Sequence, residues 1–443
     1  MKASRSPAPK SEREVTLERK SIRVRLEPNT GQREKLAQAA GSRRFVYNWA
    51  LNRWQQHYAE HKKTILLKDL SRELTELKYL EDTSWLQDVD SQLQQQALAD
   101  LRGSFQNFFA KRAKYPRFRC KGRSKESFRI PQRVVVKGRR LYVPKVGHVR
   151  TSEPIDLTGL THKSTTFSLD SDGHWYASLV VQFELPKLAL PKLQDNDKTI
   201  GIDLGLKDLM VLSDGTVHGN PRWYRKHELK LAKAQRELSR KKKGSKNRAK
   251  AKQKVARAHA RVRLVRADHI HKLTIGLVSR YDTVVIEDLC IRGMAKTKLS
   301  KSIYDASLGE IRRQLEYKAR WNNTRLIVID RWFPSSKTCS NCGLINKQLQ
   351  LKDRSWTCQG CQVEHDRDWN ASISIRAEGL RLEGIDVAVG NTETLNACGE
   401  PIRRQVASAA GALLVEARTP SDLSVGVSGG KWSQKIRSAT PGK

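Results

Sequence analysis

The stretch Lys198–Val217, KTIGIDLGLKDLMVLSDGTV, decides the fold of the second half of the chain. An apolar run contains Asp203, a short glycine-containing turn follows, and a second apolar run leads to the turn signal Asp214-Gly215. Apolar runs bounded by turn residues predict two neighbouring strands. Two more buried strands are predicted later, at YDTVVIEDL and TRLIVIDRW. We therefore expect a sheet built from segments that lie far apart in the sequence.

Acidic residues stand at critical places in these segments. Asp203 lies within the first strand, Glu287 ends the apolar run TVVIED, and Asp366 and Asp368 begin a helix that we expect to reach about Leu382. A carboxylate on a buried strand is unfavourable unless it is paired or binds a metal. Two Mg²⁺ ions would offset the repulsion between converging acids, activate a water molecule and stabilise the leaving oxygen of a phosphodiester. The pattern predicts a metal-dependent nuclease site.

Two other interpretations of these acids stay open at this point. The sequence IED at the end of a strand is also typical of a helix cap. The sequence GIDLG, taken alone, resembles the phosphate loop of actin-like ATPases. That family needs a second glycine-rich loop of the form DxGxG, and the chain has none.

The cysteine spacing predicts a zinc site. Cys339-x2-Cys342 is followed, after fifteen residues, by Cys358-x2-Cys361. Two CxxC hairpins present four thiolates to one tetrahedral ion, and four sulfur ligands leave no open position, so the zinc would be structural. We leave His365 out of this ligand set. The other cysteines, Cys120, Cys290 and Cys398, have no partner at ligand spacing.

The charge predicts a polyanionic partner. The chain has 443 residues, with 84 Lys and Arg against 46 Asp and Glu, a net charge of +38. Nucleic acid is the first candidate and an anionic membrane surface the second, and no apolar run approaches the roughly 20 residues of a membrane span. The chain has seven cysteines, an odd number, and its N-terminus has no apolar core. Together these features indicate a reducing compartment. We expect a cytoplasmic, nucleoid-associated protein.

The most basic segment is predicted to be a helical hairpin. Residues 225–263 hold seventeen basic and two acidic residues, with KKKGSKN as the turn. We expect it to bind phosphates rather than serve only solubility. The candidate nucleic-acid contacts here are Lys241, Lys242, Lys243, Lys246 and Arg248.

The N-terminal half changes pattern twice. After a flexible basic tail at 1–19, residues 20–29 and 120–190 alternate like the strands of a β-barrel or sandwich, and Asp172-Gly173 is a hairpin turn signal. Residues 30–119 read as an inserted helical bundle. On its first helix, Arg43, Arg44, Tyr47 and Asn48 are candidates for reading DNA bases or bracing RNA, although Tyr47 also fits a plain core position.

Three blocks of sequence together resemble the TnpB (OrfB) family, transposon-encoded relatives of the type V CRISPR effector nucleases. They are GIDLGLKDLMVLSDG, VVIEDLCIRGMAK and TCSNCG…WTCQGCQVEHDRDWNAS. The resemblance covers roughly residues 20–384. It implies Asp203, Glu287 and Asp368 as the catalytic acids, with Asp366 as the rival for the third place. NASISI stands where many relatives have NAAxNI, and the tail at 385–443, which we expect to be disordered, is poorly matched.

The resemblance also implies an α+β multidomain architecture. An RNase H-like (RuvC) α/β domain would occupy 196–334, with the basic hairpin at 222–280, a zinc ribbon at 335–365 and a last RuvC segment at 366–384. The N-terminal barrel would be the wedge domain, and 30–119 the recognition lobe.

The implied function is RNA-guided, Mg²⁺-dependent cleavage of DNA. The partners would be a guide RNA from the transposon end and target double-stranded DNA, with a short flanking motif read by protein. Alternatives are a guided DNA-binding regulator without cleavage, a transposase or its accessory protein, and an ATPase. We expect a monomer, and we expect the zinc ribbon to fix the geometry of the last acid.

Overall fold

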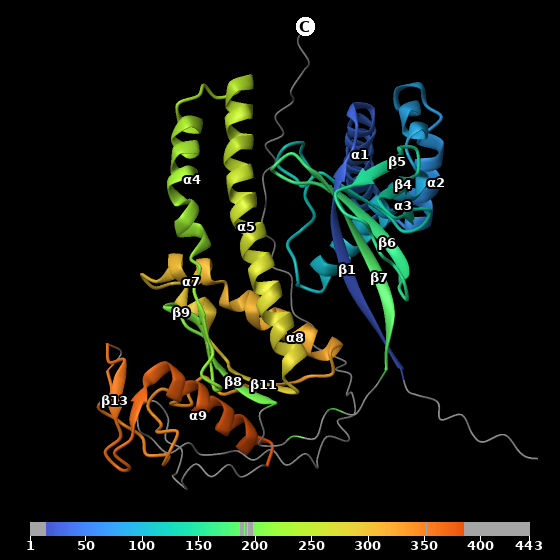
Figure 1. Ribbon diagram of the computed structural model, residues 1–443. Helices are drawn as coiled ribbons and strands as arrows, with labels where there is room; N and C mark the ends of the chain where they lie inside the picture. The colour runs from blue at the N-terminus through green and yellow to red at the C-terminus, as the bar shows by residue number, and fades with distance from the viewer. Residues whose placement is uncertain (1–14, 187–189, 191–192, 194–197, 351, 385–443) are drawn as a thin grey trace, which may run out of the picture.

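The structure is a computed structural model that describes residues 15–186, 190, 193, 198–350 and 352–384. Its described part has two large sheets with helices around them (Figure 1) and a two-stranded sheet formed by β13 (Ser355–Thr357) and β14 (Glu364–Asp366). The tail expected at 385–443, and residues 1–14 of the tail expected at 1–19, lie outside the described residues. Among the residues described, no helix is both long and apolar enough to cross a membrane.

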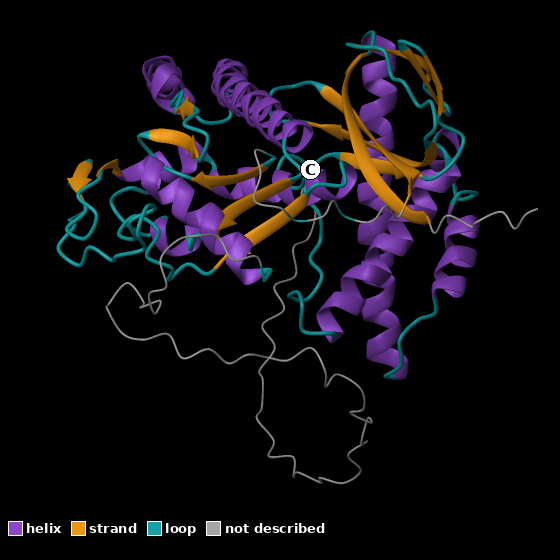
Figure 2. Cartoon of the chain, turned by 60° about the horizontal axis from the view of Figure 1, so that its bottom comes forward, coloured by secondary structure: helices purple, strands orange, loops and turns teal. Residues whose placement is uncertain are grey.

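The first sheet is antiparallel and comes from the N-terminal half. Within the described residues its strand order is β2-β6-β7-β1-β5-β4-β3, and Figure 2 shows it strongly curved. The strands are β1 (Val15–Glu27), β2 (Ser127–Ile130), β3 (Val135–Lys137), β4 (Arg140–Val143), β5 (Gly147–Thr151), β6 (Thr161–Leu169) and β7 (Trp175–Pro186). The predicted turn at Asp172-Gly173 is confirmed between β6 and β7, where Gly173 has a φ of +86°.

Strand β1 begins at Val15, inside the segment that the sequence assigns to a tail. Residues 15–20 pair with β7 in the register Val15↔Pro186 to Lys20↔Val181. Their side chains are mostly exposed and lack the apolar alternation of a half-buried strand. Backbone pairing with the long strand β7 therefore extends β1, and side-chain burial does not.

Helices α1 (Thr30–His61), α2 (Leu67–Leu77) and α3 (Ser91–Phe109), with the 3-10 helix η1 (Glu81–Asp88), follow β1. Asn29 caps α1, because its side chain accepts from the N–H of Gln32 while the Gln32 side chain accepts from the N–H of Asn29. The helices share a core in which the ring of Trp54 stacks on Phe105, with 4.3 Å between centroids.

The second sheet is mixed. The described strands are β8 (Thr199–Asp203), β9 (Asp208–Leu212), β10 (Val217–Gly219), β11 (Thr283–Glu287) and β12 (Arg325–Ile329). Their order is β10-β9-β8-β11-β12, in which β8, β11 and β12 are parallel, while β9 runs antiparallel to both of its neighbours. The four strands predicted from the apolar runs are confirmed, and β10 is added.

Helices cover both faces of this sheet (Figure 1). They are α4 (Trp223–Ser239), α5 (Lys246–Arg280), α6 (Ile291–Met294), α7 (Ser300–Ala306), α8 (Leu308–Trp321) and α9 (Arg367–Leu382). On one face α5 and α8 bury Ile202, Ile286 and neighbouring side chains. On the other face Ile375 of α9 packs with Val285. The hairpin α4–α5 extends well beyond the sheet in Figure 1.

Two glycines let α9 lie directly against the strands. A Cβ atom at Gly201 in β8 would lie 2.2 Å from the carbonyl oxygen of Ser372 and 2.6 Å from the nitrogen of Arg376. A Cβ at Gly379 in α9 would lie 2.5 Å from Cγ1 of Val285. These contacts at Gly201 are with backbone atoms, which cannot rotate away as a side chain can. The position of α9 on the sheet therefore depends on the missing side chain.

We expect Gly201→Ala to destabilise the chain by about 1–3 kcal/mol, the usual range for overpacking a core. The measurement is urea unfolding. Gly276→Ala is the matched control, because Gly276 lies in α5 and a Cβ atom added there would have nothing within 4 Å. A helical Gly→Ala change there should stabilise by about 0.5–1 kcal/mol. Equal stability of Gly201→Ala and the unsubstituted chain would contradict the close contact.

Candidate active site and metal centre

Asp203 and Glu287 end two neighbouring parallel strands. Strands β8 and β11 pair up to Ile202↔Ile286, so the next residue of each strand is one of the two acids. The carboxyl ends of adjacent parallel strands are the usual position of a functional site in an α/β sheet. Two carboxylates from segments more than eighty residues apart are therefore held side by side by the sheet.

The environment of Asp203 favours its neutral form. Burial and, after it, the charges of Glu287 and Asp368 raise the pKa of Asp203 from its ordinary 3.8 to about 7, while the charge of Arg367 opposes the shift. Burial also raises the pKa of Glu287, although the hydroxyl of Ser335 donates to its Oε1 and acts in the opposite direction. A cation between these groups would favour their ionised forms.

The two aspartates of the sequence DRD, Asp366 and Asp368, make different contacts in the structure. Asp366 is the N-cap of α9, and its Oδ1 accepts from the N–H of Asp368 at 3.1 Å and of Trp369 at 2.9 Å. Asp368 lies in the first turn, and its charge acts on Asp203. The guanidinium of Arg354 lies 3.4 Å from Oδ2 of Asp368. Asp366 is thus engaged with backbone N–H groups, whereas the charge of Asp368 acts on Asp203.

The donor set formed by Asp203, Glu287 and Asp368 fits a hard divalent cation. Carboxylate oxygens are the protein ligands that Mg²⁺ prefers. Binding of such a cation would offset the repulsion that Glu287 and Asp368 exert on the Asp203 carboxylate.

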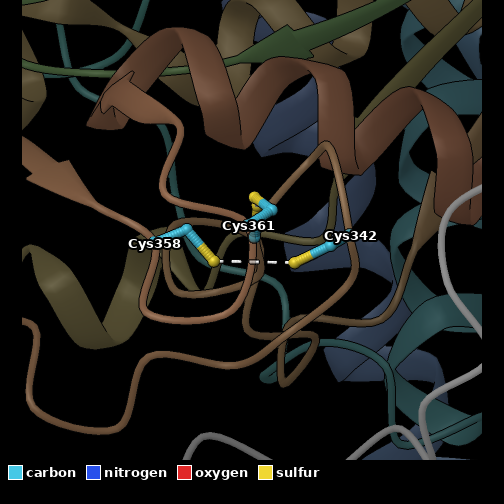
Figure 3. Close-up of side chains that lie close together, drawn as sticks. Cys342, Cys358 and Cys361 are labelled. Carbon is cyan, nitrogen blue, oxygen red and sulfur yellow. Dashed lines mark hydrogen bonds between the residues drawn. The ribbon is translucent and has the colours of Figure 1, made fainter.

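The four predicted cysteines lie close together, and Figure 3 shows three of them, Cys342, Cys358 and Cys361. The ligand atoms of Cys339, Cys342, Cys358 and Cys361 all lie within 4.8 Å of one another, and in the described part of the chain no other group of three or more possible ligands does so. Sγ of Cys342 lies 3.5 Å from that of Cys358, the contact drawn in Figure 3. Four close sulfurs fit a tetrahedral zinc ion.

The two CxxC hairpins have the same backbone geometry. In the first, the N–H of Cys339 donates to Leu344 and the N–H of Gly343 donates to Cys339. In the second, Cys358 donates to Val363 and Gln362 to Cys358. Both turns need a positive φ, +78° at Gly343 and +60° at Gln362. The equivalence brings two thiols from each hairpin to one ion.

Burial and hydrogen bonds shift the pKa values of the cysteine thiols in different directions. Burial raises the pKa of Cys339 to about 12, whereas hydrogen bonds from Asn341 and Val363 lower the pKa of Cys361 to about 6. Nε2 of His365 lies 3.0 Å from Sγ of Cys339, so this buried histidine contacts a ligand sulfur. A ring N–H bonded to a thiolate supports a metal site from outside the ligand set.

Asn370 connects the cysteine segment to α9. Its side chain donates to the carbonyl of Thr338 at 2.7 Å and accepts from the N–H of Ser340 at 2.8 Å, the residues on either side of Cys339. Ser374, one turn later, also donates to Thr338, at 3.2 Å. Asn370 is 1% exposed, so both bonds are shielded from water. One metal-binding hairpin is therefore fixed to the helix turn that carries Asp368.

The four candidates on α1 are mostly engaged within the protein. Arg43 pairs with Asp100 at 2.5 Å and Tyr47 is 3% exposed in the helical core. The Asn48 side chain exchanges two hydrogen bonds with the backbone of Arg119, at 2.8 and 2.9 Å. Arg44 lies 3.9 Å from Glu126 and lines a surface cavity with the tryptophans at 49 and 85.

The five candidates in the basic hairpin divide into two kinds. Lys241, Lys242, Lys243 and Lys246 are exposed at the turn between α4 and α5. Arg248 instead donates to the carbonyls of Leu238 and Lys241, both at 2.9 Å, at the end of α4. Four lysines are thus available to a phosphate, and the arginine stabilises the turn that presents them.

Sequence reasoning missed the side chains that hold the acids. Ser335, Arg354 and Asn370 contact or position Glu287, Asp368 and α9. Serine, arginine and asparagine are common in loops and caps, so their type carries little signal. The position of Asn370, two residues after Asp368 and one turn into a buried helix, was the available indication.

Family models match three parts of the chain. The OrfB_IS605 model, described as "Probable transposase", matches residues 178–298, and a Cas12f1-like TNB domain matches 309–375. A helix-turn-helix domain model matches 19–63, where the structure has the end of β1 followed by α1.

Among solved structures, a Cas12f1–sgRNA–target DNA complex matches with a TM-score of 0.42 and 14% identity, over 82% of this chain and 99% of that one. A CRISPR-Cas12f ternary complex matches with a TM-score of 0.33 and 15% identity, over 78% and 81%.

Relatives align over most of their length. A "Putative RNA-guided DNA endonuclease" of Streptomyces pristinaespiralis is 39% identical over 399 residues, 87% of this chain and 92% of the relative. "Putative RNA-guided DNA endonuclease InsQ" of Escherichia coli K12 is 34% identical over 377 residues, 81% and 92% of the two chains. These matches confirm the resemblance carried by the sequence blocks, and the chain belongs to the TnpB (OrfB) family.

Proposed function

We propose that this chain is an RNA-guided DNA endonuclease. The observation that carries the proposal is that Asp203 and Glu287 end two neighbouring parallel strands and that the charge of Asp368 acts on Asp203, in a chain whose relatives are named as such endonucleases. A protein that only bound DNA would have no use for three carboxylates in so unfavourable an arrangement.

The three acids would hold catalytic Mg²⁺. When bound, a pair of such ions activates the attacking water and stabilises the leaving oxygen of the phosphodiester. The chain supplies the geometry: two adjacent strand ends fix Asp203 and Glu287, and α9 holds Asp368 over β8. Ser335 orients Glu287 by donating to its Oε1, and Arg354 orients Asp368. The mixed second sheet supports a RuvC-like assignment for 196–334 and 366–384.

The cysteine cluster would hold structural zinc in a ribbon at 335–365. Four thiolates close the coordination of the ion, so it would not take part in the reaction. The bonds from Asn370 to either side of Cys339 support a role for the ribbon in placing α9 and its Asp368.

The other parts of the chain would bind nucleic acid. The curved sheet formed from 20–29 and 120–190 would be the wedge, the helices of 30–119 the recognition lobe, and the lysines at the tip of 222–280 a contact for guide RNA or target DNA. A guide–target duplex in a basic channel fits the net charge of +38.

The test is to purify the protein from cells that carry its flanking DNA, sequence the bound RNA, and assay plasmid cleavage in Mg²⁺. The expected result is cleavage by the unsubstituted protein and none by Asp203→Asn. Bound RNA and target binding without cleavage would favour a guided regulator. Absence of bound RNA would refute guidance.

Asn370→Asp should weaken the link between ribbon and helix. The new carboxylate loses the donor to Thr338 and faces its carbonyl oxygen, so we expect a loss of about 1–3 kcal/mol in stability. Cleavage should fall about 10–100-fold, because small displacements of catalytic groups have effects of this size. Ser374→Ala, which removes the longer bond to the same carbonyl, is the control and should have a smaller effect. Unchanged cleavage by Asn370→Asp would contradict the link.

The pKa of Asp203 predicts a pH-dependent stability in magnesium-free buffer. Between pH 3.8 and about 7 the folded chain binds more protons at Asp203 than the unfolded chain does, so stability falls as pH rises through this window. Asp203→Asn removes the effect. We expect the variant to have the higher Tm at pH 8 and nearly the same Tm at pH 4, measured on zinc-loaded protein. Added Mg²⁺ should raise the Tm of the unsubstituted chain at pH 8. A Tm difference independent of pH would contradict the assignment.

A further inference from the structure

We infer a phosphate-binding site for the DNA strand in a basic cavity whose lining residue Arg354 also contacts Asp368. The cavity has a volume of about 350 Å³. Its lining includes Lys207 after β8, Arg222 and Arg225 at the start of α4, and Arg354 from the cysteine segment. The inference rests on the proposed function and adds a subsite to it.

The charge around the cavity is unbalanced. Four cationic side chains line it, all of them on exposed residues, and the one acid in the lining is Asp305. Two of the four are paired with acids outside the lining, Lys207 with Asp208 at 3.6 Å and Arg354 with Asp368 at 3.4 Å. The Asp305 carboxylate accepts from the backbone N–H groups of Tyr224 and Arg225, at 2.8 and 3.4 Å, and so acts as a cap for α4. Among the described residues neither the Arg222 nor the Arg225 side chain has an ion pair. Clustered cations of this kind favour an anionic partner.

The backbone of one of these arginines, Arg222, has a strained conformation. Arg222 has a φ of +51°, a left-handed conformation that a residue with a side chain rarely adopts. Asn220 supports it, since Oδ1 of Asn220 accepts from the N–H of Arg222 at 3.1 Å while its amide donates to Leu206 at 2.9 Å. Backbone strain of this kind is concentrated at functional sites.

The position of the cavity selects the DNA strand as the occupant. Arg354 lines the cavity and also lies 3.4 Å from Asp368. Lys207 lines it as well as a second cavity, of about 470 Å³, whose walls include Asp368 and the exposed ring of Trp369. Basic grooves with an exposed aromatic ring are typical of single-strand binding. A strand whose phosphodiester lies at the acids would reach the basic cavity with a neighbouring phosphate.

The experiment uses the full chain with its RNA and with Asp203→Asn, so that binding is measured without cleavage. Fluorescence anisotropy of a labelled oligothymidylate is followed against NaCl concentration. Arg222→Ala/Arg225→Ala should lower the slope of log affinity against log salt by about 1.4, the value for two single-strand phosphate contacts. Arg222→Lys/Arg225→Lys should keep most of the slope. Arg313→Ala/Arg320→Ala, with the same loss of charge on exposed positions of α8 and outside the segments proposed to bind nucleic acid, should leave it unchanged.

Three results would overturn the site. The slope could be unchanged in the alanine pair, it could fall equally in the α8 control, or the affinity for guide RNA could fall in place of that for DNA. Failure of the proposed function is a separate result. If the unsubstituted protein fails to cleave while the alanine pair still lowers the slope, the phosphate site stands and the nuclease assignment falls.

Discussion

Replacing Asp203 with asparagine should reduce DNA cleavage by at least about 10³-fold and leave RNA and DNA binding intact. Asparagine has nearly the shape of aspartate but no charge, so the strand end is preserved while a ligand of the metal is lost. Stabilisation of transition-state charge by bound metal is worth several kcal/mol, and about 4 kcal/mol corresponds to about 10³-fold in rate. Single-turnover cleavage of target plasmid measures the effect.

Three further substitutions test which acids are required for cleavage. Asp282→Asn changes a half-exposed acid just before β11, at the opposite end of the strand from Glu287, and should cleave normally. Asp366→Asn should also stay active, since asparagine caps a helix about as well as aspartate. Asp368→Asn should behave like Asp203→Asn. Loss of cleavage in Asp366→Asn with activity in Asp368→Asn would reverse the assignment of the third acid.

Replacing Cys358 with alanine should remove zinc and abolish cleavage. Zinc binding by four-ligand structural sites contributes about 10–16 kcal/mol at neutral pH, as much as the roughly 5–15 kcal/mol that stabilises a whole domain. The hydrophobic core among the cysteines is small, with Leu349 and Trp356 as its other buried members, so it cannot replace the ion. The measurements are zinc content by mass spectrometry and plasmid cleavage.

The control for this variant is Cys120→Ser, an exposed cysteine outside the cluster. It should keep both zinc and cleavage. A strong chelator should reproduce the loss in the unsubstituted protein, and addition of zinc together with Mg²⁺ should restore activity. Full recovery with Mg²⁺ alone would mean that the ribbon does not position the catalytic acids.

The cysteine cluster could be predicted from the sequence because spacing alone constrains it. Each CxxC segment forms a hairpin of its own, and two such hairpins need only one ion to meet. The apolar runs likewise predicted β8, β9, β11 and β12, since strands buried on both faces leave a plain signal.

The choice between Asp366 and Asp368 could not be made from local pattern. Both residues precede the same helix, and only the N-cap geometry shows which carboxylate bonds to backbone N–H groups. The same limit applies to Asn48 and Arg248. Each is of a type that suits nucleic acid, and each forms long-range or turn contacts that no short window of sequence reveals.

The contact between α9 and β8 also affects how the chain is made. Val285 and Ile329 leave the ribosome well before α9 is complete, because Leu382 at its end lies 53 residues after the end of β12, or roughly 3–10 s of synthesis. During that interval one face of the nascent sheet has no helix to cover it. The cleavage site is also incomplete, because Asp368 has not been synthesised. We therefore expect a partly synthesised chain to be prone to aggregation but unable to cleave nearby DNA.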